Sequence, residues 1–395
     1  MAADVFDPST TVALRKSSFF VRFIALGLAA HAYVGLRLIP DLGVGLPGAL
    51  VGALLLLASC IVIPLGMLSR SSGRQPFGDR MAWIGLLAMG FFSSLFVLTV
   101  IRDAALLLAW FAALGGLSVP WPGLRQGSAI AVPALALLAS AVGFYNARRR
   151  APVVDVDLPI ADLPAALEGY TIVQLSDIHV GPTIKRGYVQ AIVDATNALA
   201  PDLIAITGDV VDGNVAQLRD HAAPLGQLRA RQGVYLVTGN HEYYSGAAPW
   251  VAEFRRLGLH VLQNEHVNLK TQDATLVVAG VTDYSAGAFD PQQRSNPVRA
   301  LAGAPAAAVR ILLAHQPRSA VAAEPVGYDV QLSGHTHGGQ FLPWRFFVRL
   351  QQPYVAGLHR HGRMWLYISR GTGYWGPPKR LGASSEITRL RLRRA

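Results

Sequence analysis

Long apolar runs fill the first part of the chain and strongly limit what it can fold into. A helix that crosses a bilayer needs roughly 20 apolar residues. Four runs reach or approach this length: Phe19–Ile39, Leu46–Leu68, Met81–Ile101 and the shorter Ala129–Tyr145. The sequence therefore predicts an all-α membrane domain over residues 1–150 with about four transmembrane helices.

A fifth apolar stretch, Ala104–Val119, leaves the number of spans open. It either continues the third run past Arg102 and Asp103 or forms a short fifth span or re-entrant piece. Basic residues cluster at three places: Arg15 and Lys16; Arg70, Arg74 and Arg80; and Arg148, Arg149 and Arg150. With four spans, all three clusters fall on one side, which the positive-inside rule assigns to the cytoplasm. We therefore expect a multi-pass protein of the cell inner membrane whose residues 151–395 are cytoplasmic.

Charge and composition narrow the class of partner. The chain is 52% hydrophobic and 15% charged, whereas about a quarter of residues are charged in soluble domains. Residues 1–150 carry 12 Lys and Arg against 5 Asp and Glu, and residues 151–395 carry 23 against 19, so the net charges are +7 and +4. The basic excess thus lies mostly beside the apolar runs, where it meets anionic lipid, and no nucleic-acid partner is expected. The single cysteine, Cys60, excludes disulfides and cysteine-based zinc sites.

The second part of the chain has the pattern of a layered α/β domain. After residue 170, runs of four to eight Val-, Ile- and Leu-rich residues recur, such as YTIVQLS, PDLIAITG and VRILLAH. Such runs are typical of buried strands, and helix-like stretches such as YVQAIVDATNAL lie between the early ones. The C-terminal RLRLRRA, in contrast, is expected to be a solvated basic tail rather than a lipid contact.

Polar side chains follow the predicted strands with unusual regularity. They are Asp177 and His179; Asp209 and Asp212; Asn240, His241 and Glu242; His315; and His335 and His337. Glycines beside them let the backbone approach closely, and functional sites form beyond the carboxyl ends of strands in such sheets. Each motif has an ordinary structural explanation such as turn chemistry, and only GHTH is suggestive alone. Five in order, each after an apolar run, indicate one shared site.

These motifs resemble those of the calcineurin-like metallophosphoesterases over roughly residues 170–385. The longer forms GNHEYYSG, SGHTHGGQ and SRGTGYWGPPKRLG resemble the bacterial membrane-attached branch of that family. That branch includes phosphodiesterases and a pyrophosphatase that cleaves UDP-2,3-diacylglucosamine. The resemblance implies a four-layer αββα sandwich and a metallophosphoesterase activity with two divalent metal ions.

By motif position, the resemblance also implies which residues act. One metal would be held by Asp177, His179, Asp209 and His337, and the other by Asp209, Asn240, His315 and His335. Asp209 would bridge the two. Carboxylate, amide and imidazole donors without thiolate suit Mn²⁺, Fe or Zn²⁺, and Mn²⁺ is our first expectation. His241 would donate a proton to the leaving oxygen, and Asp212 would orient it, unless Asp212 is only a turn cap.

The expected function is hydrolysis of a phosphodiester or pyrophosphate by metal-activated water. Membrane attachment favours a lipid-linked substrate such as UDP-2,3-diacylglucosamine. The alternatives are a phosphodiesterase for soluble substrates and a non-enzymatic membrane receptor or scaffold on the same fold. Aromatic residues flank the motifs, and either shape a pocket or membrane-facing rim or belong to the core: Tyr243, Tyr244, Trp344, Tyr374 and Trp375.

Overall fold

The chain forms two compact units. A computed structural model describes residues 8–69, 75–305 and 309–395. A helical unit extends to Ala141, and a mixed α/β unit runs from Val142 to Ala395.

Among its described residues, the helical unit is built from four long helices, the last of which runs on into the mixed unit: α1 (Pro8–Leu38), α2 (Gly45–Ser69), α3 (Phe77–Leu114) and α4 (Trp121–Arg148). All four contain a stretch that is long and apolar enough to cross a membrane, which confirms the predicted helical bundle with four apolar spans. Most large apolar side chains of these helices are exposed, as lipid-facing side chains are in a membrane helix. Within the described residues, Ala104–Leu114 continues α3 instead of forming a separate helix.

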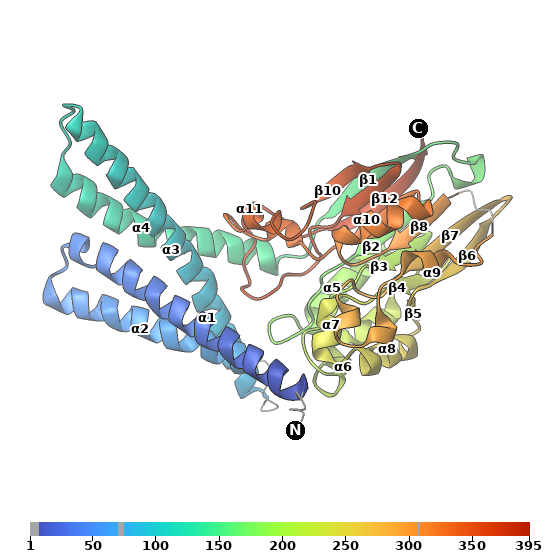
Figure 1. Ribbon diagram of the computed structural model, residues 1–395, viewed down its shortest axis with the longest axis horizontal. Coiled ribbons are helices and arrows are strands. Elements are labelled where there is room, and N and C mark those ends of the chain that lie inside the picture. The colour runs from blue at the N-terminus through green and yellow to red at the C-terminus, as the bar shows by residue number, and fades with distance from the viewer. Residues whose placement is uncertain (1–7, 70–74, 306–308) are drawn as a thin grey trace, which may run out of the picture. The chain divides into compact units, whose positions relative to one another are not determined.

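The mixed unit is built on two six-stranded sheets (Figure 1). The first has the order β1 (Val153–Ile160), β12 (Ile387–Arg394), β2 (Thr171–Leu175), β3 (Leu203–Ile206), β4 (Val234–Leu236), β5 (His260–Val261). The second has the order β10 (Gly357–His361), β11 (Met364–Ile368), β9 (Val330–Ser333), β8 (Val309–Leu313), β7 (Ala274–Gly280), β6 (Glu265–Thr271). Strands β2, β3 and β4 are parallel neighbours in the first sheet, and β7, β8 and β9 are parallel neighbours in the second.

The two sheets pack face to face. Alternate residues of each strand point to opposite sides, so one face of each sheet can pack against the other sheet. Ile172 of β2 faces the core between the sheets, which Ile311 and Leu332 of the second sheet also enter. The next residue, Val173, faces the opposite side, where the first sheet is covered by helices. Where both faces are buried, as in the central strand β3, the strand is apolar at every position.

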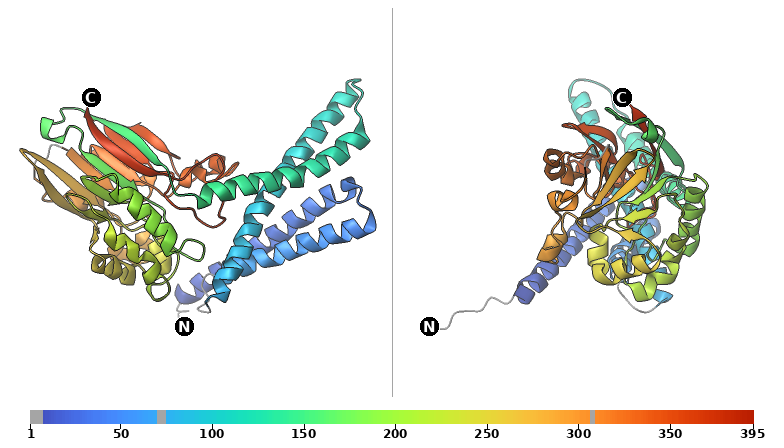
Figure 2. Two further views of the ribbon diagram at one scale, coloured as in Figure 1. Left: turned by 180° about the vertical axis from the view of Figure 1, so that it is seen from behind. Right: turned by 90° about the vertical axis from the view of Figure 1, so that its right-hand side faces the viewer.

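Helices cover the outer faces of both sheets (Figure 2). On the first sheet these are α5 (Arg186–Asn197), α6 (Val215–Ala222) and α8 (Ala247–Arg256), and on the second α9 (Pro297–Leu301) and α10 (Ala320–Ala323). Trp250 and Phe254 of α8 are fully buried against the first sheet. This arrangement confirms the predicted four-layer αββα sandwich.

The C-terminal strand corrects one expectation. RLRLRRA is not a solvated tail, because it forms most of β12, which lies between β1 and β2. Leu390 and Leu392 are buried between the sheets, and the arginines alternate with them on the other face. Arg389 pairs there with Asp155 of β1, with Nε 2.6 Å from Oδ1. The alternation of Leu and Arg is the period of a half-buried strand, which the basic composition concealed.

The last turns of α4, from Val142 to Arg148, belong to the mixed unit. The carbonyl oxygen of Gly143 accepts a hydrogen bond of 2.8 Å from the backbone nitrogen of Arg380. Arg148 Nη1 donates to the hydroxyl of Tyr374 at 3.0 Å and to the carbonyl oxygen of Thr183 at 2.8 Å. Loops of the mixed unit therefore hold the end of an apolar helix.

Candidate metal centre

Every polar residue predicted for the site follows the carboxyl end of a strand. Asp177 and His179 follow β2, Asp209 and Asp212 follow β3, and Asn240 and His241 begin the short helix α7 (Asn240–Ser245) after β4. His315 follows β8, and His335 and His337 follow β9. Because these strands are parallel neighbours within their sheets, their loops emerge along one edge of the sandwich.

The backbone at this edge is strained. Five of the predicted ligands have a left-handed backbone conformation: Asp177 (φ 52°), His179 (56°), Asp209 (52°), His335 (70°) and His337 (52°). This region costs side-chain-bearing residues about 1–3 kcal/mol each, and such strain clusters at functional sites. The sheets on either side hold these turns in place, and the turns direct the predicted ligands toward one another.

Two glycines allow the loops to approach each other. A Cβ atom on Gly334 would overlap the side chains of Ser176 and Asp177, and one on Gly239 would overlap the carboxylate of Asp209. Glycine at these two positions therefore brings the β9 loop against the β2 loop, and the β4 loop against the β3 loop.

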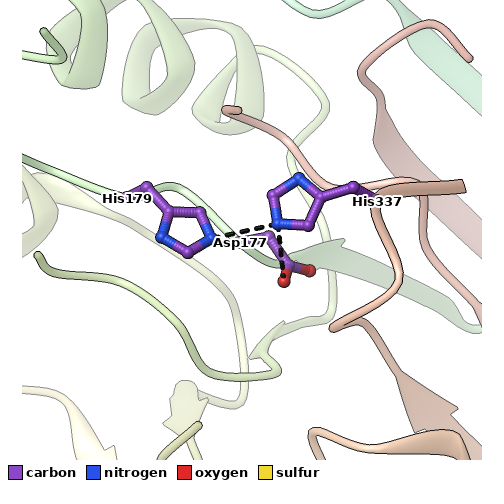
Figure 3. Close-up of side chains that lie close together, drawn as sticks. All are labelled: Asp177, His179 and His337. Carbon is purple, nitrogen blue, oxygen red and sulfur yellow. Dashed lines mark hydrogen bonds and ion pairs between the residues drawn. The ribbon is translucent and has the colours of Figure 1, made fainter. Parts of the chain in front are cut away.

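The first group of side chains comprises Asp177, His179 and His337 (Figure 3). His179 Nε2 lies 3.0 Å from His337 Nε2, which in turn lies 3.3 Å from Asp177 Oδ1. All three residues are buried. Two imidazole nitrogens and a carboxylate oxygen thus lie close together, and they form a donor set for a divalent cation.

The second group comprises Asp209, His315 and His335. His315 Nε2 lies 3.1 Å from Asp209 Oδ2 and 3.2 Å from His335 Nδ1. His315 Nδ1 lies 2.7 Å from the carbonyl oxygen of Thr207, which can only accept a hydrogen bond. The proton of neutral His315 is therefore on Nδ1, and the lone pair of Nε2 is directed at the group.

Asp209 also faces the first group. Its Oδ2 lies 3.9 Å from His179 Nε2, while its Oδ1 accepts a hydrogen bond of 2.9 Å from the backbone nitrogen of His241. One carboxylate therefore lies within reach of donor atoms from both groups, where it can neutralise charge on either side.

Asn240 supplies an independent test of whether a cation fits. Its side chain is buried, and its Oδ1 atom has no hydrogen-bond partner among the described residues. A buried amide oxygen without a partner costs about 1–3 kcal/mol, and a cation removes that cost. The residues at this edge therefore fit a bound divalent metal.

The charge states of His335 and His337 agree with this donor set, whereas His315 differs from them. Burial lowers the pKa of His315, but Asp209 and Asp177 outweigh it and raise this pKa well above its usual value, so a metal would displace a proton from that ring. Burial and the neighbouring His315 lower the pKa of His335 to about 3. Burial and the adjacent His179 hold the pKa of His337 well below its usual value. Burial disfavours ionisation of Asp209, but His315 and His241 outweigh it and lower the pKa of that carboxyl. At neutral pH, His335 and His337 thus offer lone pairs and Asp209 offers a negative charge.

His241 and Asp212 form a pair beside these groups. His241 Nδ1 lies 2.6 Å from Asp212 Oδ1, an oxygen that also lies 3.0 Å from His179 Nδ1. Burial lowers the pKa of His241, but Asp209 and Asp212 outweigh it and raise this pKa to about 9. The ring is 15% exposed and contacts the rings of Tyr244 and Trp375. It therefore borders solvent, whereas the side chains of His179 and His315 are at most 1% exposed.

Two buried charged residues support the site without having been predicted as members of it. Glu242, which the sequence pattern named without a role, accepts hydrogen bonds from the backbone nitrogens of Gly239, Asp209, Val210 and Val211. Arg380 is buried, with Nη2 3.3 Å from His337 Nδ1 and Nη1 3.3 Å from the carbonyl oxygen of His337. Arg380 follows His337 by more than forty residues. The motif SRGTGYWGPPKRLG, which contains Arg380, was the one signal in the sequence that could have pointed to this contact.

Comparison with known proteins identifies the family. A family model described as calcineurin-like phosphoesterase matches residues 170–339. A transmembrane protein with metallophosphoesterase domain from Bos taurus is 40% identical over 312 residues, which cover 76% of this chain and 70% of that protein. The chain is a calcineurin-like metallophosphoesterase. A protein of the same description from Danio rerio is 39% identical to this metallophosphoesterase over 273 residues, or 66% of this chain and 62% of the relative.

Relatives of the metallophosphoesterase also occur in bacteria. An uncharacterized metallophosphoesterase of Helicobacter pylori (strain J99) is 36% identical over 255 residues, which cover 63% of this chain and 66% of the relative. Because the relatives from Bos taurus and Danio rerio are named as transmembrane proteins, similar membrane proteins are not confined to the bacterial branch that the motifs resemble. Members of this family are phosphoesterases that use divalent metals, and the buried carboxylate and imidazole groups of this chain are suited to hold such a metal.

Proposed function

We propose that the metallophosphoesterase is a membrane-anchored, two-metal phosphohydrolase that cleaves a phosphodiester or pyrophosphate bond. The observation that carries this proposal is that Asp209, a member of the second three-residue group, also faces His179 of the first group. The buried amide oxygen of Asn240, which has no hydrogen-bond partner among the described residues, agrees with it. One metal is assigned to Asp177, His179, Asp209 and His337, and the other to Asp209, Asn240, His315 and His335. When bound, two such metals activate a water and neutralise charge on the phosphoryl group.

Asp209, His241 and Asp212 have different roles in the proposed reaction. Asp209 balances positive charge on both sides of the centre. His241, at the solvent-facing border, donates a proton to the leaving oxygen, which would otherwise depart as an unstable alkoxide. Asp212 accepts from His241 Nδ1, so the proton to be donated is on Nε2 and the ring is held in one orientation.

The proposed metal is Mn²⁺, with Fe and Zn²⁺ as the alternatives. The donors are carboxylate oxygens, one amide oxygen and imidazole nitrogens, and no thiolate is involved, since the only cysteine is Cys60. Such mixed oxygen and nitrogen sets suit these metals. Chelation followed by addition of each metal separately identifies the one that restores turnover.

A cavity lined in part by the loop that follows His315 supports a substrate with a second anionic group. It has a volume of about 580 Å³ and is lined by Arg294, Arg318, Tyr284 and Gln316, the last of which directly follows His315. The guanidinium of Arg318 lies 5.2 Å from the centre of the Tyr284 ring. A guanidinium binds phosphate by paired hydrogen bonds, so this cavity suits the far phosphate of a pyrophosphate or the second ester arm of a diester.

We further propose that the substrate is lipid-linked, in the manner of UDP-2,3-diacylglucosamine, and that the centre faces the cytoplasm at the inner membrane. The support is the attachment of the site to four apolar helices and the three basic clusters beside them. A hydrolysis panel tests this directly, with UDP-2,3-diacylglucosamine, bis-(p-nitrophenyl) phosphate and p-nitrophenyl phosphate compared before and after chelation.

The panel also separates the alternatives. Preference for the soluble diester would favour a phosphodiesterase of soluble substrates, and no metal-dependent turnover of any ester would favour a receptor or scaffold. An Arg318→Gln variant sharpens the result. It should raise KM for the nucleotide-linked pyrophosphate while leaving p-nitrophenyl phosphate unchanged, because the monoester has no group to place in the cavity.

A further inference from the structure

An exposed aromatic and basic segment lies next to the metal centre. The segment Leu342–Leu350, here called the aromatic segment, includes the short helix α11 (Arg345–Val348). Its large apolar side chains have these exposed fractions: Leu342 45%, Trp344 42%, Phe346 69%, Phe347 54% and Leu350 82%. Arg345 and Arg349 are exposed between them. Five large apolar residues within nine positions mark an interaction surface instead of the scattered exposure that is normal for a soluble domain.

The aromatic segment is fixed to the loop that carries His337. Gly339 has a left-handed backbone, and a Cβ atom there would overlap the Cα atom of Arg345, so the two loops are in backbone contact. Trp344 N donates to the carbonyl oxygen of Phe341 at 3.1 Å, and Leu342 N donates to that of Leu381 at 3.1 Å. A body that binds the aromatic segment is therefore held at a fixed place relative to the metal centre.

The loop that contains Leu381 also contacts the end of a membrane helix. Arg380, the neighbour of Leu381, donates its backbone N–H to Gly143 of α4, and its carbonyl oxygen accepts from Asn146 Nδ2 at 3.3 Å. Two consecutive residues thus join the aromatic segment to the last turns of an apolar helix within one compact unit.

We propose that the aromatic segment docks on the surface of an anionic bilayer and holds the metal centre at the level of the lipid headgroups. Trp and Phe side chains are at home in the interface between headgroups and acyl chains. Arg345 and Arg349 complement the charge of anionic lipids. The occupant is a bilayer because the segment is fixed to the end of a helix that enters one, and because its arginines match the charge of that surface. This proposal concerns location and does not depend on which phosphate ester is cleaved.

The test measures whether residue 346 touches lipid in the full chain. Cys60→Ser removes the only cysteine, and Phe346→Cys or Val298→Cys then places one environment-sensitive fluorophore. Val298 lies on α9 and is 64% exposed, which matches Phe346 at 69%. The labelled proteins are reconstituted in phosphatidylcholine vesicles with or without phosphatidylglycerol, and with or without nitroxide-labelled lipid.

We expect the nitroxide lipid to quench the label at 346 and not the label at 298. Quenching at 346 should increase when phosphatidylglycerol is present and decrease in high salt, because the arginines contribute through charge. Equal quenching at the two positions would refute the docking. A label at 346 that neither lipid nitroxide nor aqueous iodide quenches would show that a second copy of the chain or another protein covers the segment, and would also overturn it.

A functional measurement adds a second arm that does not need the label. In the Phe346→Glu and Phe347→Glu double variant, two charges replace two interfacial anchors outside the catalytic site. Turnover of bis-(p-nitrophenyl) phosphate should stay at the wild-type level, while turnover of a phosphate ester presented in vesicles should be lost. The matched control is Val298→Glu, which should change neither. Equal rates of the double variant and wild type on the vesicle substrate would contradict the proposal, whereas inactivity of the wild type on every ester would contradict only the proposed function.

Discussion

Replacement of His241 by alanine should separate proton donation from metal binding. His241 lies beside Asn240, its Nδ1 is bonded to Asp212, and its Nε2 lies 3.9 Å from Asp209 Oδ2. Its side chain is 15% exposed, and we assign it to proton donation instead of metal binding. Loss of a general acid typically costs about 10²–10⁴ in rate, which corresponds to roughly 3–5 kcal/mol of the activation barrier. His241→Ala should therefore keep both metals and lose most of kcat.

The size of the loss should depend on the leaving group. A nitrophenolate leaves without protonation, so His241→Ala should be only slightly impaired on bis-(p-nitrophenyl) phosphate. An alkoxide leaving group needs the proton and should show the full loss. Metal content, measured by mass spectrometry of the purified full chain, and rates across a series of aryl and alkyl esters give both quantities on one preparation.

Two further variants serve as controls for His241→Ala. His337→Ala should lose metal and activity together, because its Nε2 faces Asp177 and His179. His266→Ala should change neither, since that ring bonds the carbonyl oxygen of Ala300 at 2.9 Å, outside the centre. If His241→Ala loses metal as His337→Ala does, or is equally slow on good and poor leaving groups, the assignment of His241 as the acid is wrong.

Other consequences can be measured more simply. Chelation should abolish turnover and Mn²⁺ should restore it best, so undiminished turnover in metal-free buffer would exclude the proposed mechanism. In the metal-free protein, Asp212→Asn should lower the pKa of His241 from its raised value of about 9, because an amide replaces the carboxylate that favours the imidazolium; NMR titration of the ring measures this. Glu242→Gln should destabilise the fold by about 1–3 kcal/mol, because an amide accepts the four backbone N–H groups less well; chemical denaturation measures the change. A reporter joined by a linker after Ala395 should behave as cytoplasmic, and periplasmic behaviour would refute the topology drawn from the basic clusters.

The sequence predicted those features whose physical signal is local. Apolar runs of membrane length, and strands followed by Asp, His or Asn, are both patterns of neighbouring residues, and both led to elements that the structure contains. The ends of the long helices were less well predicted, because Arg102 and Asp103 suggested a boundary that α3 passes through. Arg102 is buried there and pairs with Asp41, so the charge is neutralised inside the bundle instead of ending the helix.

What the sequence could not predict depends on contacts between distant segments. The carboxylate of Glu242 ties the β3 loop to the β4 loop, and Arg380 contacts His337 from a loop far along the chain. Composition misled at the C-terminus, where the arginines of β12 hid buried leucines. A two-residue period was visible there, but its neighbours in the sheet, β1 and β2, lie at the other end of the domain sequence.

The position of β12 sets an order on biosynthesis. In the first sheet, as far as the structure describes it, β1 is joined to the rest through β12, which is made after every other strand of that sheet. The apolar helices can enter the bilayer while the chain is still growing, but β1 must wait unpaired until β12 emerges from the ribosome. The catalytic unit therefore completes its sheet only after synthesis of β12, and a nascent or truncated chain that lacks β12 would be anchored in the membrane with an open strand edge that invites association with other chains.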